Sequence, residues 1–285
     1  MSAVPAAPRS RLLRRFRRSR GGMVGAVIVV VVILVALLAP LLAPHPFDAT
    51  DLLNTWAPPD HVNRLGTDRL GRDIASRLIM GARVSLLVAS SVLAITLCVG
   101  VVFGGVAGLF GGTADGLIMR AVDIVLAFPE VVLAILVAAV LGTGTTTVIV
   151  ALSLVWWPGI ARLTRSLVLV QKQELYVDAA IVCGTPRLEI LWRHILPNIA
   201  APLLVRASIG VGFIIMAEAT LSFLGLGVQE PTPSWGSMIR DGLPTLRSDP
   251  YLAMFSSIVI GVTIIGFNLL GDGLRDTLDP RLHGH

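Results

Sequence analysis

Six long apolar stretches are spread along this chain, and they decide the environment in which it folds. Each is close to the roughly 20 residues that an α-helix needs to cross the hydrocarbon core of a bilayer. They lie at residues 23–43, 84–110, 117–141, 147–163, 199–223 and 252–270. Charged residues make up 14% of the chain, against roughly 25% in a typical soluble protein. The sequence therefore predicts an all-α polytopic membrane protein with six transmembrane helices.

Basic residues between the stretches predict which side of the membrane each segment occupies, because cytoplasmic loops are enriched in Lys and Arg. Seven arginines precede the first stretch. The side that holds them has 15 basic residues in total, against 7 on the opposite side. We therefore expect both termini in the cytoplasm. A cleaved signal peptide is the alternative for the first stretch, but that stretch is longer than the usual apolar region of such a peptide.

These boundaries divide the chain into four parts. We expect a cytoplasmic Arg-rich tail at 1–22, a first transmembrane helix at 23–43, an extracytoplasmic segment with an amphipathic helix at 44–83, and a core of five transmembrane helices at 84–285. Within this core we expect an inner loop at 166–198, an outer loop at 225–250 and a cytoplasmic C-terminal tail at 271–285.

The extracytoplasmic segment carries oppositely charged residues at helical spacing. Asp68 and Arg72 are four residues apart, and so are Asp73 and Arg77, a separation at which ion pairs stabilise a helix. Thr67 is suited to cap this helix. The pattern fits either a solvated interfacial helix or a surface for docking or gating. In the outer loop, Ser234 could cap a short segment that begins at Trp235.

Four ionisable residues fall inside predicted spans. Asp123 and Glu130 lie in the third, and Arg206 and Glu218 lie in the fifth. Such residues are costly in lipid and usually face a protein interior or a water-filled path. Three interpretations stay open, namely pairing of Arg206 with one of the acids, lining of a substrate path, and a proton relay.

A row of glycines in the second stretch predicts close contact with another helix. Gly100, Gly104 and Gly108 recur every four residues, and Gly112 continues the row. Small residues on one helix face let a second backbone approach closely in a membrane.

The inner loop predicts two short helices separated by a break. Gly184 suits the left-handed conformation that ends a helix, Thr185 suits the N-cap of the next helix, and Pro186 suits its first position. Four apolar side chains then recur at helical spacing: Leu188, Leu191, Trp192 and Ile195. This stripe has to be covered, either by the lipid surface or by a groove in a soluble partner.

This loop resembles the EAA loop of permeases from ATP-binding-cassette (ABC) importers. The match consists of Asp178-Ala179-Ala180, then Gly184, then His194-Ile195-Leu196-Pro197, with Asp178 in place of the usual glutamate. The run that ends at Asn198 is similar to the dipeptide, oligopeptide and nickel permease group. Further matches to that group include Gly71-Arg72-Asp73, Leu126-Ala127-Phe128-Pro129, and the run from Glu218 to Gly227. The resemblance implies a type I importer permease fold and a C-type subunit of a dipeptide or oligopeptide importer.

The resemblance also implies roles for particular residues. In this family the loop couples the membrane subunit to a cytoplasmic ATPase, which implies a coupling role for Asp178, Ala179, Ala180, Gly184, Thr185, Pro186, Arg187, Leu188, Leu191, Arg193, His194 and Pro197. We expect the substrate path to involve Asp123, Glu130, Arg206 and Glu218. We expect the outer gate or the docking surface for a binding protein to involve Asp68, Arg72, Asp73 and Trp235.

The partners follow from the same resemblance. It implies a second permease of the B type, two ATP-binding subunits or one fused ATPase, and an extracytoplasmic peptide-binding protein, all at a bacterial inner membrane. ATP and Mg would bind the ATPase subunits, so we expect no cofactor, metal or catalytic residue on this chain. The only lysine, Lys172, is not in a phosphate-binding loop motif.

Two matters stay open at this point. The cargo of this group includes dipeptides, oligopeptides, nickel chelates and haem-like molecules. The main alternative from another class is a proton-driven secondary transporter that uses Asp123, Glu130 or Glu218 as carriers. An intramembrane enzyme is disfavoured, because the sequence lacks the Gly-x-Ser-x-Gly and His-Glu-x-x-His motifs.

Overall fold

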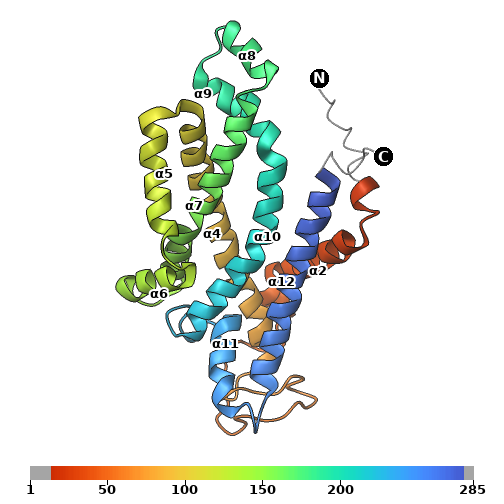
Figure 1. Cartoon of the computed structure of the whole chain (residues 1–285). Coiled ribbons are helices and arrows are strands. Elements are labelled where there is room, and N and C mark those ends of the chain that lie inside the picture. The colour runs from red at the N-terminus through yellow and green to blue at the C-terminus, as the bar shows by residue number, and fades with distance from the viewer. Residues whose placement is uncertain (1–13, 279–285) are drawn as a thin grey trace.

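A computed structural model of the chain describes residues 14–278, which form an elongated bundle of helices (Figure 1). The long helices are α2 (Arg20–Leu37), α4 (Ile74–Phe110), α7 (Thr145–Gln171), α10 (Leu196–Phe223) and α12 (Tyr251–Leu278). The shorter elements are α3 (Ala39–Leu42), α5 (Gly112–Leu126), α6 (Glu130–Leu141), α8 (Leu175–Val182), α9 (Arg187–Glu189), the π-helical η1 (Ile190–Ile195), α11 (Trp235–Gly242) and the 3-10 helix η2 (Leu243–Thr245). Within the described residues there is no strand, so the predicted all-α class is confirmed.

The spans differ from the prediction at the third apolar stretch. Five helices are long and apolar enough to cross a membrane, and α5 with α6 forms a sixth, broken span that bends by 89°. We predicted one helix over 117–141. Pro129 ends it, because proline has no N–H to donate and disfavours helical backbone in the preceding Phe128. This signal was present in the sequence.

The glycine row brings α4 against another helix, as predicted, and that helix is α7. A Cβ atom on Gly100 would lie 2.6 Å from Ile160 Cβ, and one on Gly108 would lie 2.8 Å from Val168 Cβ. A Cβ atom on Gly104 would collide with the carbonyl oxygen of Ala161. The prediction was wrong for Gly112, which has no such neighbour because α4 ends at Phe110.

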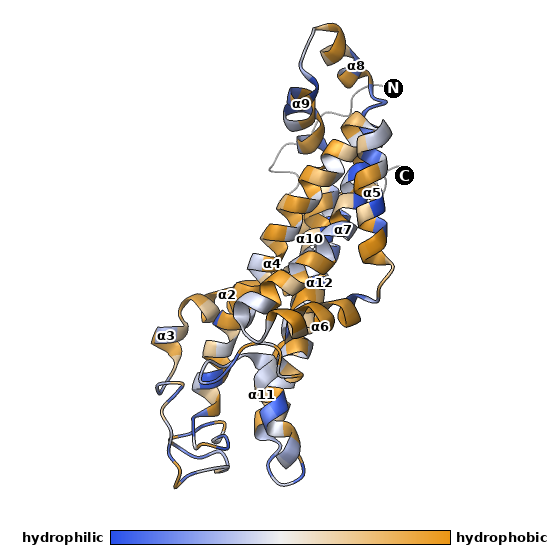
Figure 2. Ribbon diagram, turned by 90° about the vertical axis from the view of Figure 1, so that its left-hand side faces the viewer, coloured by the Kyte–Doolittle hydropathy of each residue, from blue (hydrophilic) through white to orange (hydrophobic). Residues whose placement is uncertain are grey.

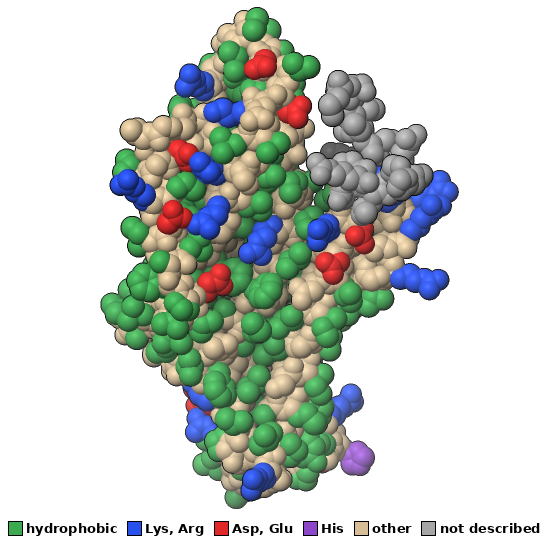
Figure 3. Space-filling model, viewed as in Figure 1, with side chains coloured by type: hydrophobic (Ala, Val, Ile, Leu, Met, Phe, Trp, Pro, Cys, Tyr) green, Lys and Arg blue, Asp and Glu red, His purple; other side chains and the backbone are tan. Residues whose placement is uncertain are grey.

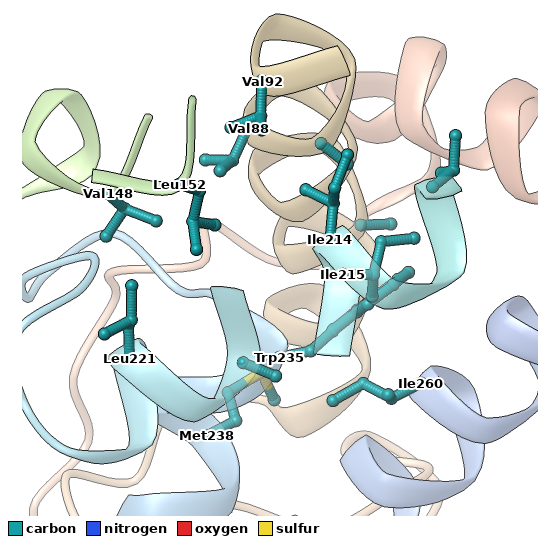
Figure 4. Close-up of a cluster of buried hydrophobic side chains, with 14 of the residues drawn as sticks. Val88, Val92, Val148, Leu152, Ile214, Ile215, Leu221, Trp235, Met238 and Ile260 are labelled. Atoms are coloured by element: carbon teal, nitrogen blue, oxygen red, sulfur yellow. The ribbon is translucent and has the colours of Figure 1, made fainter. Parts of the chain in front are cut away.

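A cluster of buried apolar side chains connects α4, α7, α10, α11 and α12. Figure 4 labels ten of these side chains, namely Val88, Val92, Val148, Leu152, Ile214, Ile215, Leu221, Trp235, Met238 and Ile260. In lipid the surroundings are as apolar as the core, so close van der Waals packing carries the association of helices. This packing fixes α11 against the membrane helices.

The segment before α4 does not form the predicted amphipathic helix. Asp73 caps α4 by accepting a hydrogen bond from Ser76 N at 2.8 Å, so that helix begins at Ile74. Thr67 is not a cap. Its hydroxyl donates to Asn54 O and accepts from Ala57 N, which ties the loop to itself.

The boundaries predicted for the inner loop and for the C-terminal tail also differ from the observed ends of the helices. α7 continues to Gln171, so the inner loop starts after residue 166, and α12 continues through the first part of the predicted tail to Leu278. Ser234 does cap α11, as predicted, through a reciprocal hydrogen-bonded pair with Ser237. The rest of the tail and the arginines at 9 and 11 lie outside the described residues.

The start of α2 and the end of α12 lie at the end of the bundle nearer α8 (Figure 1). A Cβ atom on Gly22 would lie 2.8 Å from Gly273 Cα, so these two helices are in close contact there. Figure 2 shows largely hydrophobic helices between α8 and the more hydrophilic segments around α11. An even number of spans is consistent with termini on one side. That this side is the cytoplasm stays a prediction.

Candidate functional site

The break in the inner loop lies where the sequence predicts it. α8 ends at Val182, and Gly184, two residues further on, has a φ of +78° in the left-handed region. Gly184 N donates to Ile181 O at 2.9 Å, and Thr185 N donates to Ala180 O at 3.0 Å. These two bonds form a Schellman motif, which satisfies the last carbonyl groups of a helix. We call residues 175–195 the tip, because α8 and α9 lie at the extreme end of the molecule (Figures 1 and 2).

The second half of the tip is not a separate helix. It runs without interruption from α9 through η1 into α10, over Arg187–Phe223. Thr185 makes no capping bond, and Pro186 occupies the N-cap position, so both predicted roles were one residue out of register. Pro197 follows η1 directly inside this continuous run, so it cannot donate the backbone hydrogen bond of its position. The π-helical turn before it is a feature that recurs at functional sites.

A second apolar cluster supports the tip from below. It joins Val177 and Ala180 of α8 to Ile190, Leu191 and Ile195 of η1, and also includes Leu109, Val168, Ile199 and Leu203. The predicted apolar stripe is therefore divided. Leu191 and Ile195 pack inside the chain, whereas Leu188 and Trp192 are exposed. The tip is thus supported by packing within the chain and still presents apolar side chains outward.

The outward side of the tip is markedly apolar for an exposed segment. Val182 is 87% exposed and Trp192 is 55% exposed, and Ile181 and Leu188 are exposed as well. The other predicted coupling residues that are exposed are Asp178, Ala179, Gly184, Pro186, Arg187, Arg193 and Pro197. Thr185 and His194 are half-buried.

Lys172 joins the base of the tip to α4, a role that sequence reasoning missed. Its Nζ atom donates to Gly108 O at 3.2 Å and to Leu109 O at 2.9 Å. These are among the last carbonyl groups of α4, which have no partner within the helix. A cation there also interacts favourably with the helix dipole.

At the opposite end of the molecule the structure brings together a group of charges, of which Asp68, Arg72 and Arg77 are buried while Arg69 and Glu230 are exposed. We call Asp68, Arg69, Arg72, Arg77 and Glu230 the outer charge cluster. Arg72 Nε donates to Asp68 Oδ2 at 2.6 Å, and Arg77 Nε lies 3.3 Å from the same oxygen. Glu230 accepts from Arg72 Nη2 at 3.0 Å and from Arg69 Nη2 at 2.7 Å. The cluster ties the segment before α4 to the loop before α11.

Burial corrects two predictions about this end. The Asp68–Arg72 pair exists, but it is only 2% exposed rather than solvated. The Asp73–Arg77 pair does not form, because Asp73 caps α4 and Arg77 turns to Asp68. None of these four side chains lies on the surface, so they can shape a docking surface only from beneath. Glu230 was missed, because nothing near it in the sequence signals a partner 158 residues away.

Trp235 is another predicted surface residue that the structure buries. It is fully buried at the start of α11, and its Nε1 atom donates to Leu78 O at 3.1 Å. A Cβ atom on Gly81 would lie 3.0 Å from the indole. Trp235 therefore anchors α11 to the first turns of α4.

The charged residues of the predicted spans do not pair as expected. Asp123 pairs with Arg162 at 2.5 Å rather than with Arg206. Glu130 and Arg206 are exposed and make no ion pair with any residue in 14–278. Figure 3 shows charged side chains over α5, α7 and α10, above an apolar region around α6.

Two of these acids occupy different environments. Glu218 is fully buried and accepts hydrogen bonds from Ser85 at 2.9 Å and Ser222 at 2.8 Å. It therefore connects α4 with α10 inside the chain, and its place does not match the predicted path-lining role. Glu130 instead opens to a hollow of about 80 Å³ that Trp156 and Phe213 also line.

The outer charge cluster makes stability depend on pH in a defined direction. Partial burial alone would raise the pKa of Glu230, but hydrogen bonds and attraction from Arg72 and Arg69 outweigh it and lower the pKa to about 2 from 4.5. The stabilisation is therefore complete above pH 4.5 and is lost as the pH falls toward 2. We expect Glu230→Gln to lower the melting temperature by a constant amount above this window and by less within it.

Thermal melting of the purified protein between pH 7 and pH 2.5 would measure this. Asp48→Asn is the matched control, because Asp48 is exposed and makes no ion pair in the described part of the chain. A melting difference for Glu230→Gln that stays the same at pH 3 and at pH 6 would contradict the assignment.

Comparison with known proteins adds independent information. Residues 100–284 match the family model described as binding-protein-dependent transport system inner membrane component. Residues 8–59 match the N-terminal TM domain of oligopeptide transport permease C. The match over 100–284 covers more than half of the chain.

Curated relatives are similar over most of their length. The oligopeptide transport system permease protein OppC of Bacillus subtilis is 41% identical over 268 residues, which cover 94% of this chain and 88% of that protein. The dipeptide transport system permease protein DppC of the same organism is 41% identical, with 85% and 76% covered. The glutathione transport system permease protein GsiD of Pectobacterium atrosepticum is 43% identical, with 79% and 74% covered.

Proposed function

The chain belongs to the family of binding-protein-dependent transport system inner membrane components, and from this premise we propose that it forms half of the translocation path of an ABC importer for dipeptides or oligopeptides. It is a multi-pass permease of the inner membrane and is not itself catalytic. Support for a peptide cargo comes from the relatives, whose names specify oligopeptide, dipeptide and glutathione transport. Glutathione is itself a small peptide.

The proposal that the tip couples this chain to an ATPase depends on the apolar side chains exposed there. Ile181, Val182, Leu188 and Trp192 are exposed on the tip, at the extreme end of the molecule. A groove in a soluble partner fits such a surface. We assign this partner as an ATP-binding subunit, of which there would be two or one fused form, with ATP and Mg bound there. The residues predicted for coupling would act through this contact.

The path itself would lie between this chain and a second permease of the B type. The exposed and unpaired Glu130 and Arg206 favour a face that another subunit or the cargo covers, because uncompensated charges at membrane depth are costly in lipid. Asp123 would join this face through its exposed pair with Arg162. On the outer side, a peptide-binding protein would dock on the surface that the outer charge cluster, Asp73 and Trp235 support from beneath.

The two native cysteines provide a direct test. Cys183 is exposed at the end of α8, and Cys98 is exposed within α4. In a Cys98→Ser variant, a benzophenone maleimide attached to Cys183 should crosslink on illumination to the ATP-binding subunit, with a yield that changes when a non-hydrolysable ATP analogue is added. A membrane-impermeant maleimide should reach Cys183 only from the cytoplasmic side.

The matched control is Cys183→Ser, which leaves Cys98 at membrane depth and should give no adduct with the ATPase. Labelling of Cys183 only from outside the cell would overturn the orientation. Peptide uptake by vesicles that lack ATP but maintain a pH gradient would instead favour the proton-driven alternative.

A further inference from the structure

A groove of about 580 Å³ lies between α2 and α4, away from both the tip and the outer charge cluster. Leu37 forms part of its α2 side, Leu87 is on its α4 side, and Val211 and Phe267 contribute from α10 and α12. Its volume falls in the range of about 300–1,000 Å³ that is typical of ligand sites. We call it the α2–α4 groove.

The groove has an apolar interior and one charged residue. Arg83 is exposed at its edge and makes no ion pair with any residue in 14–278. Ser90 is the other polar side chain of the lining, and its hydroxyl donates to Leu87 O at 3.1 Å. The serine is thus satisfied within its own helix, and Arg83 is the group left without a partner.

The length of the groove corresponds to one leaflet. Arg83 directly precedes the apolar stretch of α4, and Leu93 also lines the groove ten residues further along this helix. At about 1.5 Å per residue this separation is about 15 Å, which is half of the hydrocarbon thickness of about 30 Å. Leu37 is the last residue of α2, so the charged end of the groove lies at the membrane boundary on the α11 side.

We propose that the α2–α4 groove binds a phospholipid with an anionic headgroup from the leaflet on the α11 side, with an acyl chain along the groove and the phosphate on Arg83. In the orientation predicted from the basic residues, this is the outer leaflet. An Arg side chain suits this contact because its guanidinium group matches phosphate geometry. The proposal does not depend on the cargo or on the ATPase.

Charge is the reason to prefer a lipid over a protein helix as the occupant. An apolar helix that filled the groove would cover its floor but offer no counter-charge to the Arg83 guanidinium, which lies at the level of the lipid headgroups. An anionic phospholipid supplies both the apolar chain and the counter-charge.

Native mass spectrometry of the complex that contains the full chain would test the proposal. The complex is isolated in the presence of equal amounts of phosphatidylglycerol and phosphatidylethanolamine with identical acyl chains, and the retained ratio is measured. We expect Arg83→Gln to lower the preference for phosphatidylglycerol about fivefold, because one basic side chain at an anionic surface contributes on the order of 1 kcal/mol. Arg83→Lys should retain most of the preference.

Arg64→Gln is the matched control, because Arg64 is also exposed, unpaired within the described residues and on the same side of the membrane. It should leave the ratio unchanged. Ser90→Trp, which fills the groove, should reduce retention of both lipids. Equal ratios for Arg83→Gln and Arg64→Gln would overturn the proposal, and so would a photoreactive benzoylphenylalanine at Ser90 that crosslinks to a polypeptide rather than to lipid.

Discussion

Replacing Gly184 by proline is expected to reduce ATP-driven peptide uptake to background while the chain still inserts into the membrane. Gly184 has a φ of +78°, and proline is confined to about −65°. Proline also removes the N–H group that donates to Ile181 O. The Schellman motif is lost, so α8 no longer meets η1 at the angle that presents the apolar side of the tip. Uptake of labelled peptide and ATP hydrolysis stimulated by the binding protein are the two measurements.

The effect should be local, because a Cβ atom at Gly184 would meet nothing within 4 Å. Gly184→Asn is the matched variant, since asparagine adopts the left-handed conformation more readily than other residues with a side chain. It should retain most of the uptake, whereas Gly184→Val should lose most of it. If Gly184→Pro transports peptide normally, the tip is not the coupling element.

Replacing Asp68 by asparagine is expected to lower the free energy of unfolding by about 3–5 kcal/mol, the range for removal of one partner from a buried ion pair. Asp68 faces two buried arginines, and of these only Arg72 also contacts Glu230. Asparagine can still accept the backbone hydrogen bonds from Leu70 N and Arg72 N. Its amide nitrogen, however, replaces Oδ2, the oxygen that accepts from Arg72 Nε, so the substitution removes this hydrogen bond together with the charge.

Chemical denaturation and limited proteolysis of the segment before α4 would measure this loss. Asp48→Asn should change the free energy of unfolding very little, because Asp48 is an exposed acid of the same segment. Adding Arg77→Met to Asp68→Asn should recover part of the lost stability, since it removes the charge left unpaired. Equal stability of Asp68→Asn and the unchanged protein would show that the cluster contributes no net stabilisation.

Features set by neighbouring residues were predictable from the sequence. The apolar stretches predicted the spans except for the break in the third, the glycines of α4 predicted close contact with another helix, and Gly184 predicted the break in the inner loop. Ser234 was identified as a cap in the same way. Each of these depends on residues a few positions apart, which is the range over which helix signals act.

Features set by distant residues were not predictable. Glu230 reaches Arg72 across 158 residues, and Arg162 reaches Asp123 across 39. The four-residue spacing of a helix predicted a nearer partner for Arg77, namely Asp73, but this ion pair does not form. Local signals also failed where two residues competed for one role, because Asp73 rather than Thr67 caps α4. The roles assigned to the coupling and path residues stay predictions.

The unbroken run from Arg187 to Phe223 has a mechanical consequence. These 37 residues form one continuous helical run, about 55 Å long at 1.5 Å per residue. The second apolar cluster packs against this run near the tip, at Ile195 and Ile199, and Glu218 joins its far part to Ser85 of α4. No loop therefore intervenes between the exposed end of the tip and this buried contact deep in the bundle.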